Sequence, residues 1–213
     1  LWGFGLSKRS EVTDEDVQAI MSHVGLSFER IDLNEVTEAK KYRFTTLRKR
    51  DPLTRIDFNG IAQGMTVDLL AELLQSRGVS DFMVEVGGEV RCGGKRSDDN
   101  PWRIAIDRPI ESEDGLDQRE LQAIVGITDA AICTSGNYRK FYEEDGVKRS
   151  HTISPFNGYP VQHGLLSATV HAVNASTADA LATACMVWGP EEGQRFIETY
   201  REANPFERVE AYF

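Results

Sequence analysis

The sequence lacks the features that mark several large classes of protein. It contains no run of about 18 apolar residues, which excludes a transmembrane helix of ordinary length. Basic residues are also few, since 24 Lys and Arg stand against 34 Asp and Glu, for a formal net charge of −10. This balance disfavours a nucleic-acid-binding surface, which needs clustered basic side chains. It suits solubility and ligands that are cations or that bring a metal ion.

Cysteine is scarce, and the three that occur, Cys92, Cys133 and Cys185, lie far apart. No Cys-x-x-Cys pair predicts a zinc site, and the odd number indicates no disulfide framework. An initial Met is missing too, because the sequence opens on Leu1 within an apolar stretch, LWGFG. Such a stretch is typical of the interior of a fold. We therefore expect an N-terminal part of the domain, with any targeting signal, to lie outside this sequence.

Hydrophobic residues make up 40% of the 213 residues, enough for a sizeable core. Residues 13–16 (TDED) predict an N-cap and an acidic first turn, and residues 57–68 predict a strand followed by a helix with leucines 69, 70, 73 and 74 on one apolar face. The pattern predicts an α+β fold of mixed sheets with packed helices, in which hairpins stand beside strand–helix–strand units. Helices are expected at about 14–24, 61–77, 176–187 and from 191, and strands at 42–47, 54–58, 81–86, 102–107, 121–127, 130–134, 138–143, 147–153, 165–173 and 209–213.

One expected helix carries residues suited to a metal ion. Asp179 and Thr183 are four residues apart, so both project from the same face. A carboxylate with a hydroxyl is the hard-oxygen chemistry that Mg²⁺ prefers. However, Asp179 lies in the first turn if Ser176 or Thr177 is the cap. Position alone favours the other interpretation, in which it only complements the positive end of its own helix.

Two glycine-rich segments suggest close approach of a ligand. Backbone amides in the segment Gly60–Gly64 could hold phosphate at a helix N-terminus, although a tight turn explains the glycines equally simply. Gly87 and Gly88 follow a strand, where they permit either a ligand or a plain turn or bulge.

His151 is the one histidine with a suggestive context, a strand end just before a proline-containing turn. It could serve as a general base for a hydroxyl nucleophile, because the imidazole pKa lies near neutral pH. A structural or exposed histidine is the alternative. No Gly-x-Ser-x-Gly elbow surrounds Ser135, which disfavours a hydrolase nucleophile there.

Taken together, these segments resemble the ApbE family of FAD:protein FMN transferases. Residues 57–64 (DFNGIAQG) look like the family's D-x-G-G-I-A-K-G, and residues 84–90 (VEVGGEV) look like V-N-x-G-G-D/E-I. Residues 134–138 (TSGNY) resemble T-S-G-D-Y, and residues 150–160 (SHTISPFNGYP) resemble x-H-I-I-D-P-x-x-G-x-P. Residues 177–183 (TADALAT) are similar to x-A-D-A-L-A-T. The resemblance covers nearly all 213 residues, which we interpret as one ApbE-like domain without its N-terminal part.

The resemblance implies an enzyme that splits FAD and transfers FMN to a Thr or Ser hydroxyl of a target flavoprotein, with release of AMP and dependence on Mg²⁺. It implies metal ligation by Asp179, Thr183 and the Ala62 backbone, and proton removal by His151. It further implies that the nucleotide lies along Gly60, Ala62, Gln63, Gly64, Gly87, Gly88, Glu89, Thr134, Ser135, Gly136 and His151.

The implied acceptor is a subunit of a membrane redox complex, and the implied location is the periplasm or another exported one, with a possible N-terminal lipid anchor as the only membrane contact. Three departures from the family pattern stand out: Gln63 replaces Lys, Asn59 replaces Gly and Ser154 replaces Asp. Two alternatives stay open. One is an FAD pyrophosphatase that forms FMN and AMP, and the other is a non-catalytic FAD-binding lipoprotein, which the Gln63 and Ser154 departures keep open.

Overall fold

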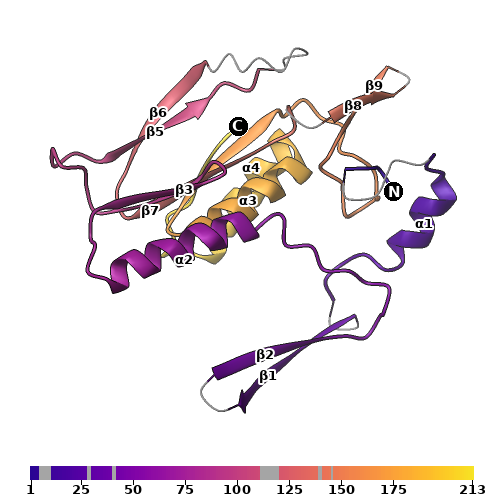
Figure 1. Ribbon diagram of the computed structural model, residues 1–213. Helices are drawn as coiled ribbons and strands as arrows, with labels where there is room; N and C mark the ends of the chain where they lie inside the picture. Colours follow the sequence, from indigo (N-terminus) through magenta and orange to yellow (C-terminus); the bar gives the residue numbers. More distant parts are fainter. Residues whose placement is uncertain (5–10, 28–29, 40–41, 111–119, 139–140, 145) are drawn as a thin grey trace. The chain divides into compact units, whose positions relative to one another are not determined.

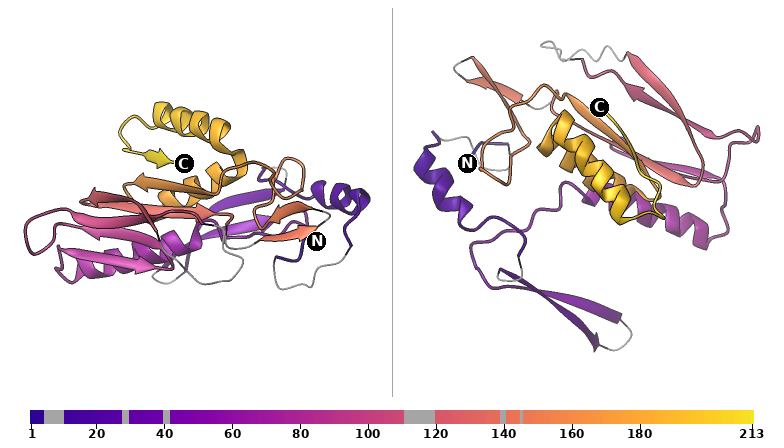
Figure 2. Two further views of the ribbon diagram at one scale, coloured as in Figure 1. Left: turned by 90° about the horizontal axis from the view of Figure 1, so that it is seen from above. Right: turned by 180° about the vertical axis from the view of Figure 1, so that it is seen from behind.

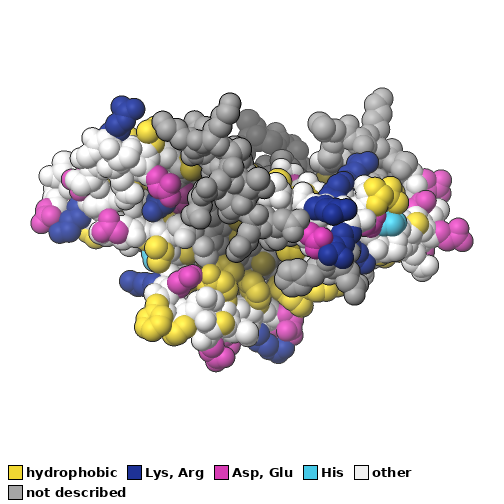
Figure 3. Space-filling view, turned by 90° about the horizontal axis from the view of Figure 1, so that it is seen from below, with side chains coloured by type: hydrophobic (Ala, Val, Ile, Leu, Met, Phe, Trp, Pro, Cys, Tyr) yellow, Lys and Arg dark blue, Asp and Glu magenta, His cyan; other side chains and the backbone are white. Residues whose placement is uncertain are grey.

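The structure is a computed structural model that describes residues 1–4, 11–27, 30–39, 42–110, 120–138, 141–144 and 146–213. These residues form two compact units, which are described separately. Unit 1 comprises residues 1–57 and 153–160, and unit 2 comprises residues 58–152 and 161–213. Within the described residues, no helix combines the length and the apolarity needed to cross a membrane. Figure 3 shows charged side chains of both signs on one face, mixed with apolar ones.

Unit 1 contains one helix and one hairpin. Helix α1 (Asp14–Met21) begins with the predicted capping box, in which the Thr13 hydroxyl and the Asp16 carboxylate each satisfy a backbone amide of the other. Strands β1 (Ile31–Ala39) and β2 (Tyr42–Lys49) pair antiparallel. Trp2 donates its indole N–H to the carbonyl of Gly158 over 2.8 Å, which attaches the start of the chain to the segment 153–160.

Unit 2 is built on a five-stranded sheet with the order β11-β10-β7-β4-β3 (Figure 1). All four of its strand pairs are antiparallel. Its strands are β3 (Phe82–Val86), β4 (Glu89–Gly93), β7 (Ala130–Gly136), β10 (Ser167–Ala172) and β11 (Glu210–Tyr212). A separate hairpin, β8 (Phe141–Glu144) with β9 (Val147–Ser150), extends from the end of β7.

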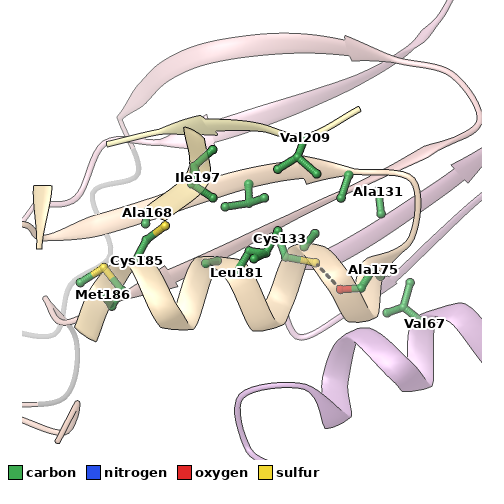
Figure 4. Packing of buried hydrophobic residues seen from close by; sticks show 14 of the residues in the cluster. Val67, Ala131, Cys133, Ala168, Ala175, Leu181, Cys185, Met186, Ile197 and Val209 are labelled. Carbon is green, nitrogen blue, oxygen red and sulfur yellow. Dashed lines mark hydrogen bonds between the residues drawn. The ribbon is translucent and has the colours of Figure 1, made fainter. Parts of the chain in front are cut away.

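Helices cover one face of this sheet and form the main core. These are α2 (Ala62–Ser76), α3 (Ala175–Trp188) and α4 (Pro190–Ala203). Helix α3 lies directly on β7 and β10, where Leu181, Cys185 and Met186 are buried against strand residues such as Cys133 (Figure 4). Helix α4 packs on α3 and β11, in front in the right-hand view of Figure 2. The core is rich in small residues, and six of its alanines have at most 1% exposure: Ala131, Ala168, Ala172, Ala175, Ala178 and Ala182.

The opposite face of the sheet carries a second, smaller core. The hairpin of β5 (Trp102–Asp107) and β6 (Leu121–Ile127) covers it, as Figure 1 shows above β7. Ile106 and Ile127 of the hairpin are buried with Ile132 of β7. Because successive side chains of a strand alternate between faces, Ile132 faces the hairpin and Cys133 faces the helices.

The α+β fold class is confirmed, but several details differ from the expectations. Residues 54–58 are not a strand, and strands β1 and β4 were not predicted. Strand β4 follows two glycines, which hid its pattern. Helix α3 begins one residue before Ser176, because the cap is Asn174, whose side chain accepts from the amide of Thr177 over 2.8 Å. The turn Asp145-Gly146 between β8 and β9 falls partly outside the described residues.

The predicted apolar face of α2 is also wrong. Leu69 and Leu73 are more than half exposed, whereas Gly64, Val67, Asp68 and Ala71 are buried. The buried positions follow the same 3.6-residue period, but they consist of small residues and one carboxylate. Small side chains allow α2 to approach α3 closely, so proximity to α3 rather than hydrophobicity selects the buried face.

Gly64 provides a test of this close approach. A Cβ atom at Gly64 would lie 2.3 Å from the carbonyl oxygen of Ala175. Gly→Ala inside a helix ordinarily stabilises by about 1 kcal/mol, but here we expect Gly64→Ala to destabilise by about 1–3 kcal/mol through overpacking. Urea unfolding measures this. Gly126→Ala is the control, because its Cβ would be no closer than 3.5 Å to another residue. A stabilised Gly64→Ala protein would contradict the close packing of α2 on α3.

Candidate functional site

The candidate site lies where the N-terminal end of α2 meets the first turns of α3, within unit 2. Asp179 is the fifth residue of α3 and is only 4% exposed. Its Oδ2 accepts the backbone N–H of Gly64, in the first turn of α2, over 3.0 Å. Asp179 therefore does serve a helix N-terminus, but the helix is α2 rather than its own. Asp179 thus belongs to the contact between the two helices.

Thr183 lies one turn further along α3 on the same face, as its spacing predicts. Its hydroxyl is 3.1 Å from that of Ser135, at the end of β7. A Cβ atom at Gly60 would lie 3.1 Å from the Thr183 methyl and 3.4 Å from its hydroxyl oxygen. The turn before α2, the end of β7 and one face of α3 thus converge on Thr183. These are the segments that the sequence singled out separately.

The chemistry of these groups suits a hard cation. Burial raises the pKa of Asp179, and the Gly64 hydrogen bond offsets only part of that effect. A cation beside the carboxylate would compensate the lost hydration and favour the ionised form. The Ala62 carbonyl, the third proposed ligand, belongs to the first residue of α2 and accepts the Thr66 hydroxyl over 2.7 Å. Within the described residues, no group of three or more His, Cys, Asp or Glu side chains gathers as metal ligands would.

Gly87 and Gly88 form the two-residue turn between β3 and β4. Both have positive φ angles, +64° and +106°, which suit a tight hairpin turn and favour glycine. The amide of Gly88 donates to the Glu85 carboxylate over 3.0 Å. A Cβ atom at Gly87 would lie 2.2 Å from the Nε2 atom of Gln63, so a larger residue there would displace the end of that side chain. The structure therefore brings Gln63 together with the Gly-Gly turn.

Glu89 follows this turn and is 7% exposed. Its Oε2 atom is buried without a hydrogen-bond partner among the described residues. Burial raises the pKa of Glu89 to about 7, and the negative charges of Asp179 and Glu85 contribute in the same direction. Glu89 is thus a second carboxyl group that folding makes difficult to ionise.

His151 follows the end of β9 and is partly buried. Its neighbour Thr152 donates its hydroxyl to the Asn137 side chain over 2.6 Å. The Asn137 amide in turn donates to the Leu166 carbonyl over 2.8 Å. These bonds attach the His151 segment to the chain directly after β7, two residues beyond Ser135.

Thr134 is a predicted site residue whose side chain points away from α3. Its hydroxyl lies 2.8 Å from that of Thr169, and alternation along β7 places both on the face opposite α3. Gly136 ends β7, where a Cβ atom would meet the Tyr138 ring and the Leu166 carbonyl. Sequence reasoning also missed Asp68, a buried carboxylate of α2 that contacts the start of α3. Asp68 lies four residues after Gly64, and this spacing, which places both on the same face of α2, could have identified it.

Comparisons with known proteins identify the family. The sequence model of the ApbE family matches residues 1–207. The chain belongs to the ApbE family. It is 42% identical over 200 residues to the FAD:protein FMN transferase of Vibrio cholerae, and 36% identical over 200 residues to that of Haemophilus influenzae. Each match covers 93% of this chain and 55% of the relative, so the chain spans about half the length of these relatives.

Solved structures of ApbE proteins show the same fold. The flavin transferase ApbE of Vibrio cholerae matches with a TM-score of 0.73 at 39% identity, over 98% of this chain and 60% of that one. The apo form of the Pseudomonas stutzeri flavinyl transferase ApbE matches with a TM-score of 0.74 at 34% identity, over 99% of this chain and 58% of that one. The expected resemblance to the ApbE family is therefore confirmed.

The buried carboxyl group of Glu89 predicts a pH-dependent stability. Its pKa is about 7 in the folded protein and near 4.5 when exposed, so only the folded protein holds this proton between those values. Its contribution to the free energy of unfolding is complete at low pH and is lost as the pH rises towards about 7.

Glu89→Gln should remove this dependence, so we expect the stability of the variant relative to wild type to rise by up to about 3 kcal/mol from about pH 4.5 to about pH 7.5. Urea unfolding in EDTA measures it. Glu72→Gln, at an exposed carboxylate on α2, controls for loss of a negative charge. Parallel pH profiles for Glu89→Gln and wild type would contradict the raised pKa.

Proposed function

We propose that this chain is the part of an FAD:protein FMN transferase that carries its metal and nucleotide site. In the proposed reaction, a Thr or Ser hydroxyl of a target protein attacks the phosphorus of the FMN half of FAD. A new P–O bond forms, the pyrophosphate P–O bond breaks, and AMP leaves. The observation that carries the proposal is the convergence of Asp179, Thr183, Ser135 and the segment Gly60–Gly64 in a member of this family.

We propose that Asp179, Thr183 and the Ala62 carbonyl hold Mg²⁺. When bound, Mg²⁺ neutralises the pyrophosphate and polarises the phosphorus under attack. Asp179 supplies the negative charge, and its bond to Gly64 fixes its orientation. Ser135 holds the Thr183 hydroxyl from the other side. A chain of net charge −10 binds a dinucleotide more readily through a cation, which supports this assignment.

The remaining site residues form the proposed nucleotide cradle. Gly87 and Gly88 expose backbone in a tight turn, and Gly60 lies in the turn before α2. Gln63 contributes an uncharged amide to this cradle. The cradle is proposed to include Gly60, Ala62, Glu89, Thr134, Ser135, Gly136 and His151, with Thr134 acting through its backbone.

The location and the acceptor are proposed from the family resemblance. We propose an acceptor that is a flavoprotein subunit of a membrane redox complex, and an exported or periplasmic location with a possible lipid anchor. The family match to residues 1–207 spans both units, which supports treating them as parts of one transferase domain.

The test is covalent flavin transfer to a peptide. With FAD, Mg²⁺ and a threonine-containing acceptor peptide, the full-length protein should add the mass of FMN to the peptide. FMN release without an acceptor, at a rate rivalling transfer, would favour the pyrophosphatase instead. Retention of FAD without turnover under any metal condition would favour a binding protein.

Loss of a proposed metal ligand should abolish transfer while the protein stays folded. We expect Asp179→Asn and Thr183→Val each to lower the transfer rate by about 100-fold or more, since single ligands and charge-stabilising groups carry several kcal/mol of the barrier. Thr199→Val is the matched control, because Thr199 is a helical threonine of α4 whose hydroxyl only caps the Arg195 carbonyl. Transfer by Asp179→Asn at the wild-type rate and ordinary Mg²⁺ would contradict the metal assignment.

His151 is the proposed general base that takes the proton from the acceptor hydroxyl. His151→Asn should lower the transfer rate by about 10²–10⁴-fold, the usual size of a general-base effect, with little change in FAD binding. Quenched time courses of transfer measure the maximal rate, and flavin fluorescence titration measures the FAD dissociation constant. A variant that loses FAD affinity but not the maximal rate would assign His151 to binding rather than to proton transfer.

A further inference from the structure

Asp68 is a buried carboxylate of α2 that accepts four hydrogen bonds. Its Oδ1 accepts the Ala175 amide over 2.9 Å and the Arg91 guanidinium over 2.7 Å. Its Oδ2 accepts the Ser176 amide over 2.8 Å and the Ser176 hydroxyl over 2.5 Å. Asp68 therefore satisfies the first two amides of α3, and the cap residue Asn174 satisfies the amide of Thr177.

These contacts connect three elements of unit 2. Asp68 belongs to α2, Arg91 to β4, and Ala175 and Ser176 to the first turn of α3. The side chains of Asp68 and Arg91 are only 10% and 18% exposed, so their ion pair is largely screened from water. Breaking such a pair on one side leaves an uncompensated buried charge. We therefore expect loss of either side chain of the Asp68–Arg91 pair to be strongly destabilising.

The network lies one helical turn from the proposed metal ligands. On α2, Gly64 precedes Asp68 by four residues, and on α3, Ala175 precedes Asp179 by four residues. Residues at this spacing share a helix face. Asp68 of α2 receives the amides of α3, and Asp179 of α3 receives the amide of α2. The two carboxylates thus hold the same pair of helices together in opposite directions.

We propose that Asp68 is a positioning residue for the Mg²⁺ site. By fixing the start of α3 against α2, it sets Asp179 and Thr183 of α3 at the correct distance from the Ala62 carbonyl of α2. This inference rests on the proposed function, because it assumes the metal ligands named there. Burial acts to raise the pKa of Asp68, but hydrogen bonds from Ser176, Ala175 and Arg91 keep it below its usual value. The carboxylate is therefore ionised at neutral pH.

The test measures metal affinity without any reaction. Mn²⁺ serves as the paramagnetic probe, and its binding to the full-length protein is followed by electron paramagnetic resonance in the absence of flavin nucleotides. We expect Asp68→Asn to weaken Mn²⁺ binding by about 10-fold or more, the usual effect of losing a group that orients metal ligands. At saturating Mg²⁺, the maximal FMN transfer rate should return to within about threefold of wild type, as expected when only the occupancy of the site has changed.

Two further variants separate positioning from loss of stability. Met186→Ala truncates a buried residue at the other end of α3, so it should lower the stability of the same helix without changing the Mn²⁺ dissociation constant. If Asp68→Asn does not fold, Ser176→Ala removes one hydroxyl from the network and should weaken Mn²⁺ binding by about threefold.

The outcomes distinguish this inference from the proposed function. A wild-type protein that neither binds Mn²⁺ nor transfers FMN would overturn both. A wild-type protein that does both, with an unchanged Mn²⁺ dissociation constant in Asp68→Asn and Ser176→Ala, would overturn the positioning role alone. Equal weakening in Met186→Ala would also overturn it, because the effect would then follow stability.

Discussion

The exchange of carboxylates between α2 and α3 is the interaction on which the rest of the site depends. Asp68 of α2 accepts amides at the start of α3, and Asp179 of α3 accepts the Gly64 amide at the start of α2. Each helix places a negative charge at the positive end of the other, in an interior where electrostatic interactions are stronger than in water. The relative position of the two helices is therefore fixed at their N-terminal ends, where the proposed ligands lie.

Close packing is the condition for this exchange. The N–H of Gly64 reaches Asp179 only because no side chain separates α2 from the Ala175 carbonyl. The buried residues of α3 at 175, 178 and 182 are alanines, whose short side chains take little space. The buried face of α2 likewise includes small residues. The leucines of α2 are displaced to exposed positions as a consequence. The buried face of α2 is therefore not its most hydrophobic one but the one that brings a carboxylate and backbone amides to α3.

The sequence predicted the elements whose signals are local, and it missed those whose cause is tertiary. The capping pair of Thr13 with Asp16 and the strand segments β5 and β6 have local signals, and both were predicted correctly. The buried face of α2 depends on α3, which lies over 100 residues away, so hydrophobic periodicity chose the wrong side. Asp179 appeared to cap its own helix for the same reason. From the sequence, only the resemblance to the family motifs assigned these separate segments to one site. Local patterns could not do so, because the contact between α2 and α3 is tertiary.

The electrostatics of the site follow from these burials. Asp179 and Glu89 are both buried, both have raised pKa values, and the charge on Asp179 makes ionisation of Glu89 harder. A Lys at position 63, the usual family residue, would relieve this repulsion, but Gln63 brings only a neutral amide towards Gly87. A cation or a proton would supply positive charge at this point. Among the described residues, the charge of the proposed site therefore depends on the protonation of Asp179 and Glu89 and on whether a cation is bound.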